Sequence, residues 1–212
     1  MFDSAIEKET RESLALLKKI PEINNFYLAG DTALSWQIGH QISIDLDFFI
    51  KEDFSPQYLL QTLEKSGVIL TDISTNTFTL RGFHDKCEIS FIKFPYILID
   101  QLKINDGINI AQLKDIGLMK ILAIADRGFR KDFIDLYFIS KFHISLQELF
   151  DLFPIKYGIN KFNTYHYIKS ITFFENAEKP TDLKLLKSVN WKDVKEFMIN
   201  ESRSLISSFS DH

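Results

Sequence analysis

Apolar and polar positions along the first half of the chain repeat with two different periods, which predicts helices and strands in turn. Helical spacing covers residues 4–20, 32–38 and 54–66, and strand-like runs cover 26–29, 42–50, 68–73, 77–83 and 86–94. Short polar separators join the last three runs and favour antiparallel hairpins. We therefore expect an α+β (α/β) core that contains a mixed sheet.

Helix ends are marked by residues that stop or cap a helix. Pro21 is expected to end the first helix, because proline cannot donate a backbone hydrogen bond. Gly39 is expected to close the second helix. Ser55 is a plausible N-cap for the third, with Pro56 in its first turn.

The second half of the chain is predicted to be helical. Asn109 followed by Gln112 resembles a capping pair for a helix that runs to about Arg127, where Gly128 stops it. Further helices are expected at 131–142, from Ser145, and at 157–174 and 191–209. No linker rich in Gly or Pro separates the halves. We predict a core of residues 1–108 and a helical C-terminal region, 109–212, packed on it.

Composition narrows the class of protein. The 212 residues are 45% hydrophobic and 25% charged, which is typical of globular proteins. The net charge of −4 argues against a generic nucleic-acid coat, which needs clustered Lys and Arg. A single cysteine, Cys87, excludes an internal disulfide, and no apolar run reaches the length of a membrane span. We expect a cytoplasmic protein without a membrane partner.

The pair Asp45 and Asp47 is the strongest chemical feature of the sequence. Alternation along the predicted strand 42–50 places Ser43, Asp45 and Asp47 on one face. A divalent cation relieves the repulsion between two close carboxylates, and Mg²⁺ often takes one or two carboxylates together with substrate phosphates. The alternative is an edge strand whose polar residues simply face solvent, which is the commoner origin of two alternating acids.

The segment 28–34 predicts a strand, a tight turn at Gly30 and the start of a helix. Backbone amides at a helix N-terminus form an anion site. Gly30 lets a phosphate approach the backbone, and Thr32 can add a hydroxyl group. Many α/β turns share this pattern, so it is suggestive only beside the carboxylate pair.

Two predicted helices of the second half carry charges in apolar surroundings. Lys120 lies among apolar residues at 118–125, with Arg127 seven residues on and near the same face. Lys120 either extends its ammonium group to the surface or binds a phosphate or an active-site carboxylate. Asp132 and Asp135 share one helical face. Asp132 is close enough to the helix start to serve as a cap, whereas Asp135 is not.

Together these blocks, at 30–34, 40–49 and 120–137, resemble the AbiEii toxin family of type IV toxin–antitoxin and abortive-infection systems. The resemblance spans roughly residues 20–142. It implies a polymerase-β-like nucleotidyltransferase core with a helical C-terminal subdomain. It also implies that Asp45 and Asp47 hold Mg²⁺, that Lys120 contacts the nucleotide phosphates, and that Asp132 or Asp135 completes the later motif. Gly30, Asp31, Thr32, Ser43 and Arg127 are expected to bind the nucleotide.

The sequence departs from this family pattern at three places. Asp31 stands where the family usually has a second glycine, which adds a negative charge close to the expected phosphates. Gln41 stands where an arginine is common. The third carboxylate of the general fold would come from the run 86–94, where Glu88 is the only acidic candidate and Ser90 is an alternative equivalent.

Three hypotheses remain from the sequence. The first is a Mg²⁺-dependent enzyme that transfers a nucleotidyl group from an NTP to a hydroxyl of an RNA such as tRNA, or of a protein, as a toxin with a cognate antitoxin. The second is a catalytically impaired module of the same fold that binds a nucleotide or a partner protein. The third is a structural α+β domain in which the two aspartates are incidental.

Overall fold

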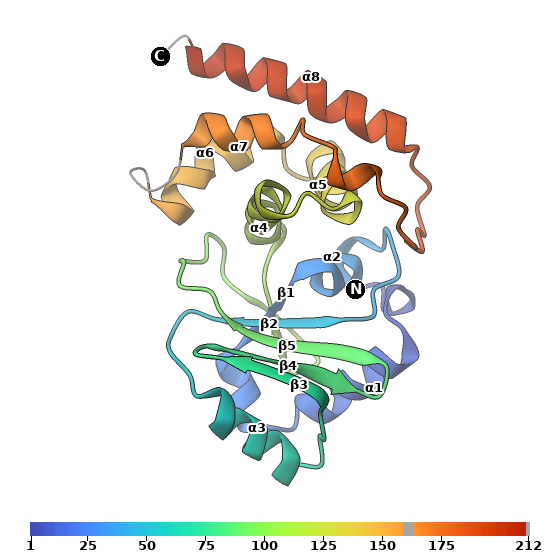
Figure 1. Ribbon diagram of the computed structural model, residues 1–212, viewed down its shortest axis with the longest axis vertical. Coiled ribbons are helices and arrows are strands. Elements are labelled where there is room, and N and C mark those ends of the chain that lie inside the picture. The colour runs from blue at the N-terminus through green and yellow to red at the C-terminus, as the bar shows by residue number, and fades with distance from the viewer. Residues whose placement is uncertain (159–162, 211–212) are drawn as a thin grey trace. The chain divides into compact units, whose positions relative to one another are not determined.

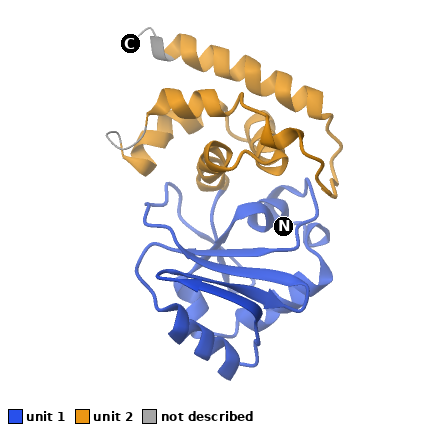
Figure 2. Cartoon of the chain, viewed as in Figure 1, with its two compact units in different colours: residues 1–112 blue, residues 113–212 orange. Residues whose placement is uncertain are grey.

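The computed structural model describes residues 1–158 and 163–210. The chain divides into two compact units, residues 1–112 and 113–212 (Figure 2). A boundary after residue 108 would divide the last strand of the sheet, which ends at Ile110. Among the described residues, no helix is both long enough and apolar enough to cross a membrane.

Unit 1 is built on one mixed sheet of seven strands in the described residues (Figure 1). Its spatial order is β3-β4-β5-β2-β1-β7-β6. Strand β1 pairs antiparallel with β2 and parallel with β7, and β2 pairs parallel with β5. The strands are β1 (Tyr27–Ala29), β2 (Leu46–Ile50), β3 (Thr71–Asn76), β4 (Thr79–His84), β5 (Cys87–Lys93), β6 (Lys103–Asn105) and β7 (Ile108–Ile110). The predicted α+β class with a mixed sheet and two antiparallel hairpins is confirmed.

One face of this sheet forms the core of unit 1. Phe48 on β2 stacks on Phe91 on β5, and both rings are fully buried. Leu80 on β4 lies opposite Phe91 in the register and continues the same apolar face. Helices α1 (Lys8–Leu17) and α3 (Pro56–Lys65) lie on this side, and α2 (Gly30–Ile38) lies on the other (Figure 1). Residues that alternate with this core, including Asp47, therefore belong to the α2 face.

Gly39 and Ser55 mark helix boundaries as expected, and Pro21 does not. Gly39 closes α2 in the left-handed conformation, and the Ser55 side chain caps α3. The first predicted helix is shorter than 4–20, because a 3-10 turn at Asp3–Ala5 precedes α1 and a second one, Pro21–Asn25, follows it. The helix thus ends at Leu17, before the proline that was expected to end it.

The predicted strand 42–50 is wrong in its first half. Strand β2 begins only at Leu46, and Ile44, which alternation would place on the face opposite Ser43 and Asp45, is 47% exposed. The segment before it pairs elsewhere: Ser43 forms an isolated bridge with Ile6, and its backbone N–H donates to the Ala5 carbonyl at 3.0 Å. Because of this pairing, the alternation of buried and exposed side chains that holds within β2 does not extend to the residues before Leu46.

Unit 2 is helical, as predicted. It contains α4 (Leu113–Asp126), α5 (Arg130–Phe142), α6 (Leu146–Tyr157), α7 (Thr164–Ser170), a 3-10 turn (Asn176–Glu178) and α8 (Trp191–Ser210). Helix α4 packs on α5 and α6, and α8 packs on α5 and α7. Its core is rich in aromatic residues, with Phe133, Phe150 and Phe153 fully buried.

Two predicted helix starts differ in outcome. Ser145 caps α6 as expected. The Asn109 capping pair is wrong, because Asn109 lies in β7 and its side-chain amide donates to the Asn24 carbonyl at 2.9 Å. Within the helix predicted at 157–174, Tyr157 is the last residue of α6 and α7 covers only Thr164–Ser170, while residues such as Lys161 and Phe162 lie outside the described ranges.

Candidate active site

The turn after β1 brings Gly30 against the Asp47 carboxylate. Gly30 has φ +68, a conformation that side chains other than glycine rarely adopt. A β-carbon placed on Gly30 would lie only 2.7 Å from Asp47 Oδ2. The lack of a side chain at Gly30 therefore makes room for the carboxylate beside the first turn of α2. Asp31, half-buried, is the acidic residue of that same turn.

A short hydrogen-bond network ties the start of α2 to the segment that leads into β2. The Thr32 and Ser43 hydroxyl oxygens are 2.6 Å apart, and the Thr32 hydroxyl donates to the backbone carbonyl of Asp45. Thr32 and Ser43 are both buried. The structure thus brings together five predicted residues of unit 1: Thr32 contacts Ser43 and the backbone of Asp45, and Gly30 lies against Asp47.

The two aspartates are not held in the way that strict alternation predicts. Asp47 lies in β2, opposite Ala29 on one side and Ser90 on the other. Asp45 precedes the strand, and its backbone carbonyl accepts the hydrogen bond of the Thr32 hydroxyl. Both side chains are half-buried, and two carboxylates beside a helix N-terminus suit Mg²⁺, which completes its shell with phosphates and water.

Glu88 is not grouped with the carboxylate pair. Its carboxylate lies 3.2 Å from Arg81 Nε on the neighbouring strand β4. Ser90 is the β5 residue opposite Asp47, and it is almost fully buried. Within residues 1–158 and 163–210 there is no group of three His, Cys, Asp or Glu side chains that could hold a metal ion. The donor set present fits a site with two protein carboxylates.

His40 and Gln41 lie just before this segment and are both buried. Gln41 stands where the resemblance implies a cation. Its burial explains why a neutral amide is tolerated there, because an unpaired arginine in the same place would carry a large desolvation cost.

Unit 2 buries a second set of predicted residues in one ionic cluster. Lys120 Nζ on α4 lies 2.5 Å from Asp135 Oδ2 and 3.3 Å from Asp132 Oδ1, both on α5. The exposed fraction is 4% for the lysine side chain and 0% for both carboxylates. The interpretation of Lys120 as a lysine that extends to solvent is therefore wrong, because two carboxylates compensate its burial.

Arg127 completes this cluster at the end of α4. Its Nε and terminal nitrogen donate to the two oxygens of Asp132 at 2.9 and 2.8 Å. Such bidentate pairing fixes the orientation of both groups. The proposed capping role of Asp132 is wrong, because α5 has no side-chain cap and the carboxylate is directed to Arg127 and Lys120. Two cations and two anions balance within the cluster.

A second buried ion pair in unit 2 was not anticipated. Lys156 Nζ on α6 lies 2.5 Å from Asp115 Oδ1 on α4, and both side chains are fully buried. Burial lowers the pKa of Lys156, and the hydrogen bond and charge of Asp115 oppose that change. The sequence signal that could have found this pair is an acidic residue, Asp115, in the apolar helix α4, but its partner lies 41 residues away in sequence.

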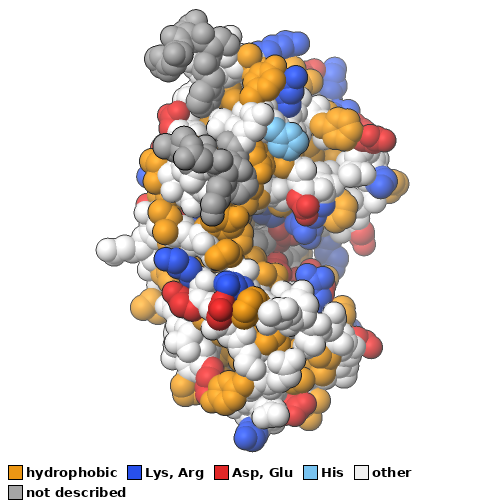
Figure 3. Space-filling view, turned by 60° about the vertical axis from the view of Figure 1, so that its left-hand side comes forward, with side chains coloured by type: hydrophobic (Ala, Val, Ile, Leu, Met, Phe, Trp, Pro, Cys, Tyr) orange, Lys and Arg blue, Asp and Glu red, His pale blue; other side chains and the backbone are white. Residues whose placement is uncertain are grey.

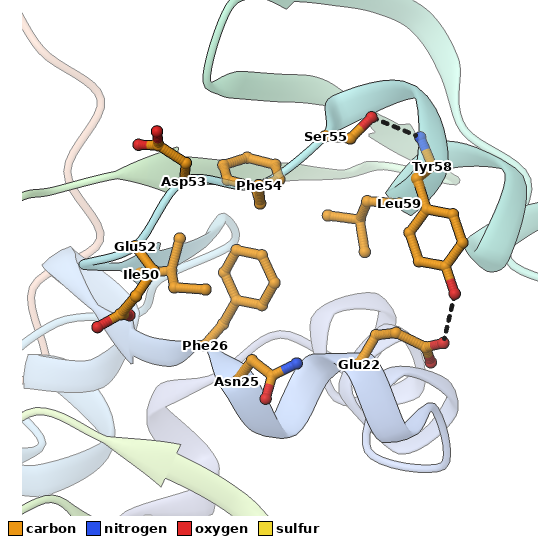
Figure 4. A pocket seen from close by; sticks show the side chains of 10 residues that line it. All are labelled: Glu22, Asn25, Phe26, Ile50, Glu52, Asp53, Phe54, Ser55, Tyr58 and Leu59. Carbon is orange, nitrogen blue, oxygen red and sulfur yellow. Dashed lines mark hydrogen bonds between the residues drawn. The ribbon is translucent and has the colours of Figure 1, made fainter.

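A cavity of about 440 Å³ in unit 1 is a rival to the carboxylate site. Figure 4 shows Phe26, Ile50 and Leu59 lining it, with Glu22 and Glu52 among the polar residues around them. It lies at the far end of β2 from Asp45, and none of the predicted site residues lines it. Three acidic side chains, Glu22, Glu52 and Asp53, line this cavity and disfavour a triphosphate.

Comparison with solved structures places the fold. MenT4, the nucleotidyltransferase toxin Rv2826c of Mycobacterium tuberculosis H37Rv, aligns with a TM-score of 0.52 and 12% identity over 93% of this chain and 86% of that chain. JHP933 from Helicobacter pylori aligns with a TM-score of 0.50 and 15% identity over 97% and 95% of the two chains. Identities this low show a shared nucleotidyltransferase fold alone.

Sequence comparison finds a nearer relative. No family model matches the chain. The uncharacterized protein aq_aa25 of Aquifex aeolicus (strain VF5) is 35% identical over 202 residues, which cover 91% of this chain and 93% of the relative. The chain therefore has the fold of nucleotidyltransferases and belongs to the same family as aq_aa25 of Aquifex aeolicus.

Proposed function

We propose that this protein is a Mg²⁺-dependent nucleotidyltransferase that moves a nucleotidyl group from an NTP to a hydroxyl of an RNA, such as tRNA, or of a protein. The observation that carries the proposal is the Asp47 carboxylate seated against Gly30 at the start of α2, with Asp45 held by Thr32 beside it. A fold shared with a nucleotidyltransferase toxin supports it.

Each group of this site has a role in the proposed transfer. Backbone N–H groups at the start of α2 bind phosphate oxygens, because they have no partner within the helix. Asp45 and Asp47 would hold Mg²⁺, which would neutralise charge on the phosphates. The acceptor oxygen bonds to the α-phosphorus, its proton passes to a carboxylate of the pair, and pyrophosphate leaves. The phosphate contact of Lys120 stays a proposal from the family resemblance alone, because its ammonium group is paired with Asp135 and Asp132 within unit 2.

Recognition of an RNA acceptor by a broad basic surface is not supported on the face shown in Figure 3. Lys and Arg side chains there are interspersed with acidic and hydrophobic ones. A short acceptor segment, such as the end of a tRNA, needs few phosphate contacts and is consistent with a net charge of −4.

Transfer is tested with each labelled NTP, Mg²⁺ and total tRNA or cell lysate as acceptor. We expect label transfer from at least one NTP by the wild type and a loss of at least a hundredfold in Asp45→Asn. The matched control is Asp72→Asn, which removes an exposed carboxylate of β3 at a backbone conformation that asparagine tolerates. Absence of transfer from all four NTPs, or equal transfer by Asp45→Asn, would contradict the proposal.

The toxin role has its own test. Expression of the wild type alone is expected to slow bacterial growth, and Asp45→Asn is expected to relieve the effect at equal protein level. A wild type that leaves growth unchanged removes the support for a toxin, while leaving the transferase proposal to the assay above.

A second candidate is a module that binds NTP without turnover. Ser90 opposite Asp47, where a third carboxylate is expected, and the extra charge of Asp31 favour it. Calorimetry separates the two candidates. NTP binding that is unchanged by Mg²⁺, together with no transfer, would favour the module.

A further inference from the structure

Arg81 lies in the same row of the sheet as Asp47. In the register of unit 1, Asp47 on β2 is opposite Ser90 on β5, and Ser90 is opposite Arg81 on β4. Leu80 and Phe48 flank this row and face the buried core, so Arg81, Ser90 and Asp47 share the opposite face. Neighbouring strands are about 4.8 Å apart, which places the Arg81 and Asp47 backbones about 10 Å apart.

The Arg81 side chain leans toward the Asp47 strand. Its Nε donates to Ser90 Oγ at 3.2 Å, and β5, which carries Ser90, lies between β4 and β2. Nε also lies 3.2 Å from Glu88 Oε1. The hydrogen bond to Ser90 and the 3.2 Å contact with Glu88 both involve Nε, and the side chain is 53% exposed, so its terminal amino groups can reach a ligand.

We propose that Arg81 binds the phosphate chain of the NTP at the Asp45/Asp47 site, and that Glu88 competes for its guanidinium when no nucleotide is bound. This inference rests on the proposed function and names a further residue of that site. A planar guanidinium can bind two phosphate oxygens at once. A third carboxylate would help to bind a second metal ion, and that ion would neutralise phosphate charge. Without this carboxylate, the guanidinium of Arg81 can neutralise the same charge.

The exchange of partners costs little in this position. The Arg81–Glu88 pair is partly exposed, and such pairs contribute little to stability. Ser90 stays hydrogen-bonded to Nε while the terminal amino groups turn to a phosphate. The buried Ser90 hydroxyl thus orients the arginine, and the half-buried Glu88 carboxylate balances its charge.

Two substitutions with opposite expected effects test this role. Binding of inorganic tripolyphosphate and of each NTP, both with Mg²⁺, is measured by calorimetry. Arg81→Ala is expected to weaken both affinities by 10- to 100-fold, as order-of-magnitude values for one charged bidentate contact, and Arg81→Lys to recover part of the loss. Glu88→Gln is expected to strengthen both affinities several-fold, because it removes the competitor. Lys65→Ala, at the exposed end of α3 on the other face, is the control.

The directions of the two affinity changes distinguish the possible outcomes. If Arg81 serves only to pair with Glu88, the two substitutions change affinity in the same direction or leave it unchanged, and the inference is wrong. If the wild type binds no NTP and no tripolyphosphate, the proposed function itself fails. Wild-type binding with unchanged affinity in Arg81→Ala contradicts the inference and leaves the proposed function standing. Thermal unfolding of each variant shows whether the sheet is intact.

Discussion

Gly30 and Gly67 share an unusual backbone conformation and differ in their surroundings. Their φ angles are +68 and +85. A β-carbon on Gly30 meets Asp47 Oδ2 at 2.7 Å, whereas a β-carbon on Gly67 meets nothing within 4 Å. Alanine at Gly67 would therefore test backbone strain alone, whereas alanine at Gly30 would add displacement of the Asp47 carboxylate.

At Gly30, replacement by alanine is expected to weaken Mg²⁺-dependent NTP binding at least tenfold. Gly67→Ala is expected to leave affinity unchanged, although each substitution costs about 1 kcal/mol of stability through its backbone conformation. Calorimetry measures the NTP affinity of both variants, and urea unfolding measures their stability. Equal affinities in the two variants would show that the Asp47 carboxylate is not needed where the structure places it.

Cys87 is expected to be unreactive in the folded protein. Burial raises the pKa of its thiol to about 12 from 9.0, and the charges of Asp45 and Asp47 add to this rise while a hydrogen bond with Thr10 opposes it. The folded state therefore keeps a proton that the unfolded state loses above about pH 9, so stability from this group falls as pH rises from 9 to 12. Alkylation by iodoacetamide at pH 8 should require urea, and rapid labelling without urea would contradict this environment.

At the scale of elements, the contact between α4 and α5 depends on charge balance. Lys120 lies between Asp132 and Asp135, and Arg127 holds Asp132 from the other side. Removal of one buried cation leaves buried carboxylates without a compensating charge. This lowers the free energy of unfolding more than replacing both partners with apolar residues does.

Lys120→Ala is therefore expected to destabilise the protein by about 3–5 kcal/mol. The double variant Lys120→Met with Asp135→Leu should recover most of this loss, because Asp132 keeps Arg127 and the new pair is apolar. Urea unfolding measures both. If the double variant is stable and still transfers nucleotidyl groups at the wild-type rate, Lys120 has only a structural role.

The sequence predicted elements well where a local signal decides them and poorly where a distant partner does. Ser55, Ser145 and Gly39 mark helix ends through their own backbone neighbours, and all three were placed correctly. The start of β2 depends on the pairing of Ser43 with Ile6, which no local pattern contains. Strands β6 and β7 have three residues each, too few for a period to be seen.

The candidate site shows the same division. The turn at Gly30 and the aspartate pair were visible in the sequence, but the contact between Gly30 and Asp47 required the register of β1 and β2. Arg81 was missed because its position opposite Ser90 follows only from the β4–β5 hairpin. The signal that could have found it is the short turn between these strands, which fixes which residues face each other.

At the scale of the whole molecule, each unit has its own core. In unit 1, β7 joins β1 to β6: Ile110 pairs with Leu28 of β1, and the Ala111 N–H donates to the Leu28 carbonyl at 2.9 Å. A fragment of residues 1–112 is therefore expected to unfold cooperatively, and one of residues 1–107 to lose that transition. Circular dichroism during heating distinguishes them, and equal midpoints would show that β7 is dispensable.

The place of β7 beside β1 also has a consequence for protein synthesis. Leu28 leaves the ribosome long before Ile110, so β1, which leads into the Gly30 turn, waits with one edge unpaired while β2 to β6 are made. Pairing between segments so distant in sequence forms late, because the intervening chain must first be ordered. A nascent or prematurely terminated chain thus carries both aspartates without the finished sheet that positions them. Unfinished copies of the protein are consequently expected to be inert inside the cell that makes them.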